Sequence, residues 1–134
     1  MPTFHLTIKT PTETLFDGAV DSVRVKTDLG RMEVLDQHAT FVGMTRYSKI
    51  YLRVDGKEQG FVVRQGTITV DESGKVAVLA LFGDKWSEMT VKTMEQYLHY
   101  LKEQLENPDQ FNEYQKQFLE EQRKALEEGI TEEK

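Results

Sequence analysis

The stretch FHLTIKTPTETLFDGAVDSVRVKTDLGRMEVLDQHATFVGM, residues 4–44, opens with apolar side chains at every second position. Phe4, Leu6 and Ile8 alternate with polar residues, and Val23 and Val25 repeat this spacing further along. A period of two is typical of strands that place one face in a core and the other in water. The stretch therefore predicts half-buried β-strands at the start of the chain.

More segments rich in β-branched residues follow, namely KIYLRV, GFVVRQ, TITV and KVAVLAL. Asp55-Gly56 and Ser73-Gly74 lie between them, and such pairs supply the positive φ angles that tight hairpins require. Many short strands at this spacing are typical of a sandwich or barrel. We therefore predict a β plus α fold that begins with an antiparallel β-sandwich of about eight to ten strands over residues 1–86.

The hydrophobic period changes to three and four residues after Gly83, which predicts two amphipathic helices over residues 87–134. A tight junction between them, NPDQ at 107–110, predicts a capping box and an antiparallel helical hairpin. Thr90 is the expected N-cap of the first helix, and the second is expected to fray near Gly129, leaving the short tail ITEEK disordered. The predicted hairpin core is Met94, Leu98, Leu101, Leu105, Phe111, Phe118 and Leu119.

Charge divides the chain in the same place. Residues 1–86 contain 11 acidic and 11 basic side chains, whereas residues 87–134 contain 12 acidic and 6 basic ones. A net charge of −6 argues against nucleic acid as a partner, because phosphate binding uses clustered Lys and Arg. The absence of cysteine excludes disulfides and thiolate metal sites.

No constellation in the sequence supports catalysis. His5, His38 and His99 fall on a predicted strand, loop and helix, without a second histidine at metal-ligand spacing. The paired glutamates of the second helix are typical of a solvated helix face. The residues therefore give no support for an enzyme, although they do not exclude one, and we predict no metal site and no cofactor.

The order of motifs along the chain resembles the epsilon subunit of bacterial F-type ATP synthases, the counterpart of the mitochondrial delta subunit. GFVVRQGTITVDESGKVAVLA continues the resemblance, and the predicted hairpin follows where the family has one. The matching positions in the opening stretch are Thr10-Pro11, Leu15-Phe16, Gly18, Val20, Val23, Val25, Gly30, Leu35 and His38-Ala39.

This resemblance implies a non-catalytic rotor subunit of the central stalk, peripheral on the cytoplasmic side of the bacterial cell membrane. The sandwich is expected to dock on the gamma subunit and the c-ring, with the alpha/beta head as a further partner and membrane contact only through the ring. Residues 28–46 match the family's docking loop. Whether His38 touches a partner or only packs within the loop stays open. The docking residues implied are Asp28, Arg31, Glu33, His38 and Arg46.

Three departures from the family pattern carry expectations of their own. Arg31 stands where an acidic residue is usual, so the ring loop facing it is expected to offer a carboxylate. Residues 89–94 lack the aspartate and arginine of the family's ATP-binding motif, so ATP binding to the hairpin is not expected. Residues 109–134 carry 8 acidic and 4 basic side chains, which disfavours inhibition by insertion of the helix among acidic catalytic-subunit loops.

Two other readings of the sequence remain. One is a stand-alone β-sandwich adaptor derived from this family with a different protein partner. The other is a nucleotide-sensing regulatory domain, for which Lys92, Tyr97 and Tyr100 are the possible contacts. Trp86 lies between the two predicted parts of the chain, and we expect its indole to pack at their junction.

Overall fold

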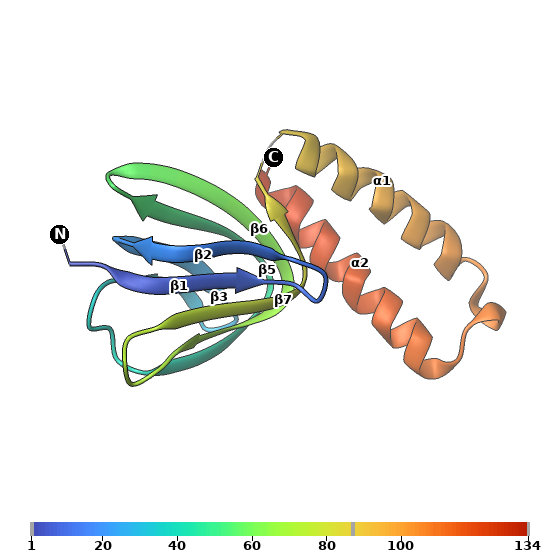
Figure 1. The fold of residues 1–134 in the computed structure, drawn as a ribbon. Coiled ribbons are helices and arrows are strands. Elements are labelled where there is room, and N and C mark those ends of the chain that lie inside the picture. The colour runs from blue at the N-terminus through green and yellow to red at the C-terminus, as the bar shows by residue number, and fades with distance from the viewer. Residues whose placement is uncertain (1, 87, 134) are drawn as a thin grey trace. The chain divides into compact units, whose positions relative to one another are not determined.

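The computed structural model describes residues 2–86 and 88–133, without the side chains of 88–91, 108, 132 and 133. The chain divides into two compact units, Met1–Trp86 and Ser87–Lys134. Strands form the first unit and helices the second (Figure 1).

The first unit contains seven strands, fewer than the eight to ten predicted. GFVVRQ and TITV were predicted as separate strands, but they belong to one strand of 14 residues. The two-residue turn Asp55-Gly56, at φ 51° and 77°, links it to a second strand of the same length and confirms the predicted tight hairpin. The strands are β1 Phe4–Lys9, β2 Thr14–Val20, β3 Ser22–Thr27, β4 Gly30–Val34, β5 Phe41–Val54, β6 Lys57–Val70 and β7 Val76–Lys85.

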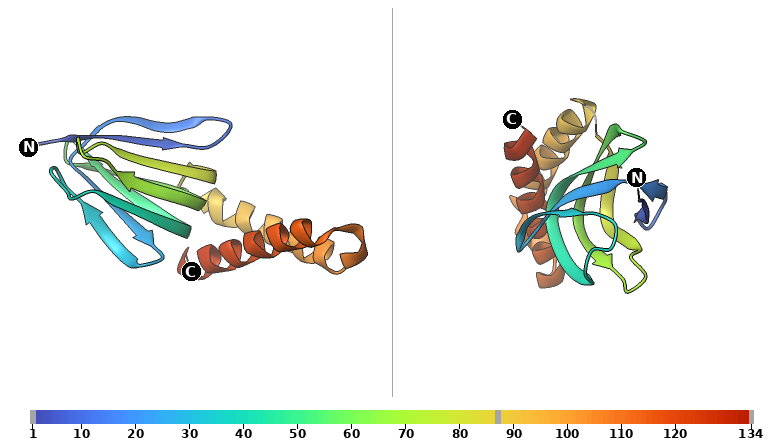
Figure 2. Two further views of the ribbon diagram at one scale, coloured as in Figure 1. Left: turned by 90° about the horizontal axis from the view of Figure 1, so that it is seen from below. Right: turned by 90° about the vertical axis from the view of Figure 1, so that its left-hand side faces the viewer.

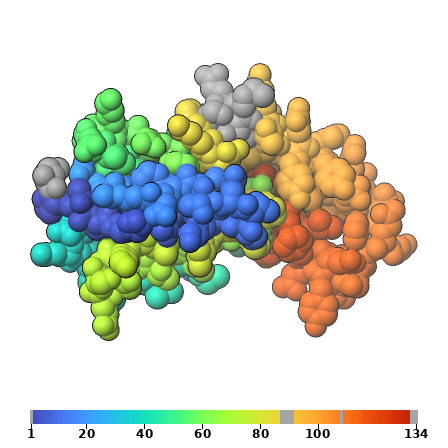
Figure 3. Space-filling model, viewed as in Figure 1, coloured from blue at the N-terminus to red at the C-terminus, as the bar shows by residue number. Residues whose placement is uncertain are grey.

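The strands form one sheet in the order β2-β1-β7-β6-β5-β3-β4. All neighbours are antiparallel except β1 and β7, which run parallel. The sheet curls, so that β2 also contacts β5 and the two ends form the layers of a sandwich (Figure 2). In the space-filling view the blue residues of β1 and β2 lie directly against yellow-green residues of β7 (Figure 3).

Alternation along the strands builds the core between the layers, as the sequence predicts. Leu6 and Ile8 of β1 are fully buried and pair with Val76 and Val78 of β7. The buried cluster also contains Phe4, Val20, Val23, Val25, Val34, Ile50, Leu52, Phe61, Val63, Ile68, Val70 and Ala80.

The alternation changes phase in the middle of β6. Phe61 and Val63 are core residues before Gln65, whereas Gly66 and Ile68 are buried after it. Gln65 has a left-handed φ of 53°, and the pairing with β5 and β7 skips this position while keeping its register. One left-handed residue therefore lets a 14-residue strand change its inward face without a shift in pairing.

The second unit is an antiparallel pair of helices, α1 Glu88–Leu105 and α2 Glu113–Glu133, joined by a short 3-10 turn, Pro108–Gln110. α1 begins before Thr90, so the prediction of an N-cap at Thr90 is wrong. The predicted fraying near Gly129 and the disordered tail are also wrong, because α2 continues to Glu133. Leu126 and Ile130 are buried on either side of Gly129, and their burial offsets the roughly 1 kcal/mol that a helical glycine costs. Neither helix is long and apolar enough, over its described residues, to cross a membrane.

The helix cap between α1 and α2 lies five residues later than predicted. Asn112 Oδ1 accepts a hydrogen bond from Gln115 N at 2.8 Å, and Gln115 Oε1 accepts one from Asn112 N at 2.9 Å. This reciprocal pair is a capping box. NEYQ at 112–115 repeats the spacing of NPDQ at 107–110, and in the latter Asn107 only starts the 3-10 turn, where its carbonyl accepts from Gln110 N at 3.3 Å.

Candidate functional site

The predicted docking loop at 28–46 is mostly strand, which corrects that part of the prediction. Arg31 and Glu33 lie on β4, and Arg46 lies on β5, while Asp28 and His38 lie in the turns between strands. Asp28, Arg31, Glu33 and Arg46 are exposed, and His38 is half-buried. The structure does not test whether these residues touch a partner, so their docking role stays a prediction.

The β3–β4 turn presents an apolar residue at its tip. Asp28 N donates to Met44 O at 2.8 Å, and Leu29 N donates to Thr27 Oγ1 at 3.2 Å. Gly30 has a φ of 121°, which favours glycine at that position. These constraints hold the turn beside β5 and leave Leu29 81% exposed.

His38 is fixed by its own loop. Its backbone N donates to Leu35 O at 3.2 Å, and its ring Nδ1 lies 2.7 Å from Ala39 O. Because a carbonyl can only accept, Nδ1 carries the proton in this contact, which leaves Nε2 as an acceptor in the neutral ring. This local role is one of the two that the sequence left open, and it does not exclude a contact with a partner.

Arg31 and Glu33 face outward on the edge strand β4. They pair in register with Lys26 and Arg24 of β3, so charges of both signs cover this part of the sheet. Arg24 also binds Glu58 at 2.6 Å, with both side chains nearly half exposed. Exposed pairs of this kind add little stability but can set the register of an approaching partner.

The sequence analysis did not predict an apolar outer face on β5 and β7. Val42 and Met44 of β5 are 74% and 61% exposed, and Leu79 and Leu81 of β7 are 55% and 46% exposed. Met44 pairs with Thr67 of β6, which pairs with Leu79, so Met44 and Leu79 lie in one row with a threonine between them. These four residues together with Leu29 are called the outer apolar face below. The sequence did contain a sign of this face, the unbroken apolar run VAVLALF at 76–82. A strand with one face in water would instead alternate apolar and polar residues.

Trp86 is the last residue of the first unit. Its backbone N donates to Gly60 O at 2.9 Å, and Lys49 Nζ lies 3.6 Å from the centroid of the indole ring. Lys49 and Arg24 also lie over the ring of Tyr51, at 5.1 and 4.7 Å. These cation–π contacts anchor Trp86 to the sandwich. Its predicted packing at the junction with the hairpin stays a prediction.

The predicted hairpin core is right in part. Met94 and Leu101 are buried, and Leu98, Leu105, Phe111 and Leu119 are half-buried. Phe118 is 46% exposed, so its assignment to the core is wrong. The predicted core omits five buried residues of α2, which are Gln122, Ala125, Leu126, Gly129 and Ile130.

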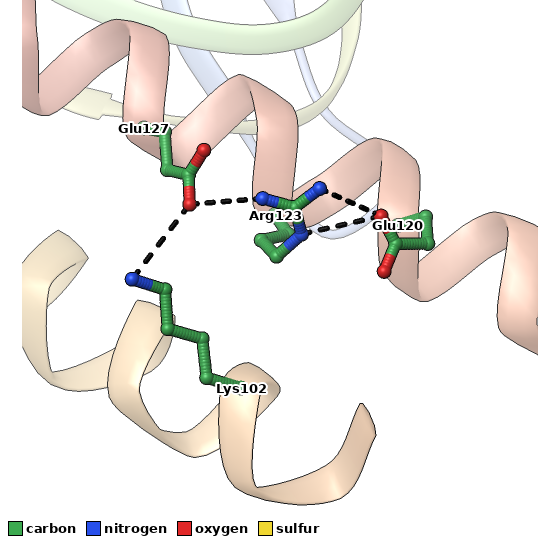
Figure 4. Close-up of polar contacts among 4 residues, drawn as sticks. All are labelled: Lys102, Glu120, Arg123 and Glu127. Carbon is green, nitrogen blue, oxygen red and sulfur yellow. Dashed lines mark hydrogen bonds and ion pairs between the residues drawn. The ribbon is translucent and has the colours of Figure 1, made fainter. Parts of the chain in front are cut away.

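Charged residues connect the two helices along one side (Figure 4). Arg123 donates to Glu120 Oε2 at 2.8 Å and to Glu127 Oε1 at 2.9 Å, and Lys102 Nζ of α1 lies 3.7 Å from the same Glu127 oxygen. The hydrogen bond to Glu120 is the largest influence on the pKa of Arg123 and raises it above its ordinary value, burial opposes this rise, and the hydrogen bond to Glu127 adds to it. These glutamates therefore have a structural role.

The described residues include no candidate metal site, and the absence of ATP binding to the hairpin stays a prediction. Among the described residues, no three His, Asp or Glu side chains are grouped to hold a metal ion. In the segment matching the ATP motif, the side chains of residues 89–91 lie outside the described part of the chain. Lys92 is exposed and Met94 is buried.

Comparison with known proteins identifies the family. Residues 3–81 match the family model described as ATP synthase, Delta/Epsilon chain, beta-sandwich domain. The ATP synthase epsilon chain of Rhodopseudomonas palustris is 32% identical over 105 residues, covering 73% of this chain and 77% of that one. The epsilon chain of Ruminococcus albus is 30% identical over 88 residues, and the match covers 66% of this chain and 65% of that relative.

The fold also agrees with a solved structure. A chain of the Euglena gracilis mitochondrial ATP synthase, solved by cryo-electron microscopy with OSCP, F1 and the c-ring, aligns at a TM-score of 0.66 and 21% identity. The alignment covers 97% of this chain and 83% of that one. The protein therefore belongs to the delta/epsilon family of ATP synthase subunits, which confirms the resemblance seen in its sequence.

Proposed function

We propose that the protein is a non-catalytic subunit of the central stalk of an F-type ATP synthase, and that its outer apolar face docks on the gamma subunit. Its place in the central stalk follows from its family, because its sequence relatives are ATP synthase epsilon chains. The choice of docking surface comes from this chain's own residues.

The exposure of the outer apolar face carries the proposal. Contiguous apolar residues on a protein surface commonly mark an interface, and each buried Å² of apolar area contributes roughly 25 cal/mol. Four of its five residues lie on β5 and β7, on either side of β6, and the sheet holds them in fixed positions. A rigid surface of this kind loses little conformational entropy on binding, as a stalk that transmits torque requires.

The c-ring contact is proposed for the charged edge of the same sheet. Arg31 and Glu33 on β4 are exposed, and rim charges set orientation and association rate more than affinity. We expect Arg31 to face a carboxylate of the ring loop. On this proposal the protein is peripheral on the cytoplasmic side of the bacterial membrane and reaches the membrane only through the ring.

The proposal includes no nucleotide in the hairpin. Thr90 and Thr93 stand at the aspartate and arginine positions of the family motif, so the pair of side chains needed to hold phosphate is missing. A thermal shift assay with ATP tests this directly. A ligand at 100 times its Kd would stabilise the fold by about 2.7 kcal/mol, and we expect no shift.

A pull-down with the gamma subunit of the same organism tests the docking surface. We compare the wild type with Met44→Asp/Leu79→Asp, and use Lys124→Asp in α2 as a control, since all three residues are exposed. The double variant should lose at least tenfold in affinity while the control binds normally. Equal binding by the double variant would overturn the choice of surface. If the folded wild type does not bind gamma, the alternative of a stand-alone β-sandwich adaptor with a different partner is favoured.

A further inference from the structure

Strand β4 lies at one end of the sheet, and among the described strands it pairs only with β3. Lys26 N of β3 donates to Ser48 Oγ of β5 at 2.9 Å, so the even-numbered residues of β3 direct their backbone groups toward β5. The odd-numbered residues of β3 therefore face β4, where their partners are the even-numbered residues. The N–H and C=O groups of Arg31 and Glu33 consequently point out of the sheet and form its outer edge.

The exposed side chains along this edge form a self-complementary row. Leu29, Arg31, Glu33 and Leu35 occupy every second position, and all four are exposed. Leu29 and Leu35 lie just before and just after β4 and are 81% and 52% exposed. An antiparallel copy presents the same row in reverse order, so leucine can meet leucine and arginine can meet glutamate at both ends of the strand.

One antiparallel register satisfies both the backbone edge and the charges. Because the outward backbone groups belong to odd-numbered residues, odd-numbered residues must lie opposite each other. When the pairing is centred on Met32, Arg31 of each copy lies opposite Glu33 of the other, and each such pair exchanges two backbone hydrogen bonds. Centring the pairing on Arg31 or on Glu33 instead places like charges opposite each other, which is destabilising.

We propose that the outer edge of β4 pairs with the same edge of a second copy of the chain, as an antiparallel two-fold dimer centred on Met32. Charges at a strand edge usually prevent pairing with other strands, and here they admit the complementary edge while they oppose the alternative registers. Residues 1–86 carry 11 acidic and 11 basic side chains, so two sandwiches do not repel each other through net charge. A single short strand makes a small interface, so the dimer is weak.

The dimer has a consequence for assembly, and this consequence rests on the proposed function. Arg31 is the residue that we expect to face the ring, and Leu29 belongs to the outer apolar face. Both residues are used in the dimer, so a paired chain cannot make the stalk contacts at the same time. Pairing therefore covers part of the docking surface in the free chain, and assembly has to separate the two copies.

Analytical ultracentrifugation of the full chain with exchanged charges tests the dimer. At about 0.5 mM chain, a dissociation constant near 1 mM still leaves roughly a third of the chains paired. Arg31→Glu and Glu33→Arg should each raise the dissociation constant at least tenfold, because each places like charges opposite each other on both sides of the two-fold axis. The double variant Arg31→Glu/Glu33→Arg restores the complementary order and should pair within about threefold of the wild type. Lys57→Glu makes the same change in net charge as Arg31→Glu at an exposed site outside β4, and it should behave as the wild type.

A mixture provides a second form of this test. Neither single variant should pair with itself, but an equal mixture of Arg31→Glu and Glu33→Arg should form the mixed dimer, because their charges are then opposite across the axis. A wild type that stays monomeric at about 0.5 mM chain would overturn the proposal. Self-association that the single variants leave unchanged, or that the double variant does not recover, would also overturn it.

The register can be measured separately, because the chain has no cysteine of its own. Residues opposite each other at a site without hydrogen bonds have Cα atoms about 4.5 Å apart, which is within disulfide range. Air oxidation should therefore link two copies of Met32→Cys, whereas Tyr114→Cys, exposed in α2, should give at least tenfold less covalent dimer. No covalent dimer from a Met32→Cys chain that is folded by circular dichroism would overturn the pairing centred on Met32. The gamma pull-down changes Met44 and Leu79, which lie outside β4, so either proposal can fail without the other.

Discussion

The sandwich buries sixteen apolar side chains in one cluster, whereas the described part of the hairpin buries five. The sandwich also has a regular ladder of strand pairs, while the hairpin adds a capping box and an ion network to its smaller set of buried residues. Core packing therefore holds the sandwich, and local polar contacts contribute a larger share in the hairpin. The two regions should respond differently to the same kinds of substitution.

The largest effect is expected in the sandwich core. Ile68 is fully buried, so Ile68→Ala should lower the free energy of unfolding by about 2–5 kcal/mol through lost contacts and a cavity. Leu79→Ala on the outer apolar face is the matched control and should change it by about 0.5 kcal/mol or less. Urea unfolding followed by Trp86 fluorescence measures both. Similar losses in the two variants would contradict the assignment of the inward and outward faces.

The next effect concerns the start of α2. Asn112→Ala removes the capping box and should cost about 1 kcal/mol, seen as reduced helicity and an earlier urea transition by circular dichroism at 222 nm. Asn107→Ala is the control within the same junction, and should cost less because its side chain is not part of the box. A larger loss from Asn107→Ala would show that the helix starts at the first NxxQ sequence instead.

A smaller effect, of opposite sign, is expected at Gln65. Its left-handed backbone costs a side chain about 1 kcal/mol, and its buried Oε1 atom has no hydrogen bond partner among the described residues. Gln65→Gly should therefore raise the unfolding free energy by about 0.5 kcal/mol, after the entropy that glycine adds to the unfolded chain. The neighbouring Gly66→Ala should destabilise, because a Cβ there would lie 2.8 Å from Leu79 O. If Gly66→Ala also raised the unfolding free energy, backbone strain at Gln65 would not explain the gain expected from Gln65→Gly.

The smallest effect is a pH dependence in the β6–β7 turn. Hydrogen bonds from Ser73, first through its hydroxyl, and from Lys75 N lower the pKa of the Asp71 carboxylate below its ordinary value of 3.8. A lowered pKa in the folded state gives stability that is present above pH 3.8 and is lost as the pH falls through the folded value. Asp71→Asn should flatten this acid decline in unfolding free energy, measured from pH 5 to 2. If Asp71→Asn leaves the fall of unfolding free energy with pH unchanged, the β6–β7 turn is not the source of that fall.

Much of this comparison could be predicted from the sequence, since periods of two and of three to four residues separate the strands from the helices at the observed place. The phase change at Gln65 could not be predicted, because it depends on how three paired strands bend together. The choice between NPDQ and NEYQ was open because both fit a capping box. Phe118 shares a helix face with the buried Gln122 and Ala125, four and seven residues later, yet it is 46% exposed. The helical period alone could not predict this, because it does not say how far burial extends along the helix.

The outer apolar face was missed for a related reason. Leu79 and Leu81 lie in an unbroken apolar run, and such a run indicates burial on both faces. No second layer covers them in the part of the chain that the structure describes, and on our proposal the gamma subunit supplies it.

Methionine oxidation tests this central claim most directly. Met44 is 61% exposed in the outer apolar face, whereas Met94 is buried and serves as an internal reference. Dilute hydrogen peroxide should oxidise Met44 rapidly in the free chain, and mass spectrometry can follow each site. We predict that a saturating amount of the gamma subunit slows oxidation of Met44 at least tenfold. Oxidation of Met44 at the same rate in the bound and free chain would contradict the account.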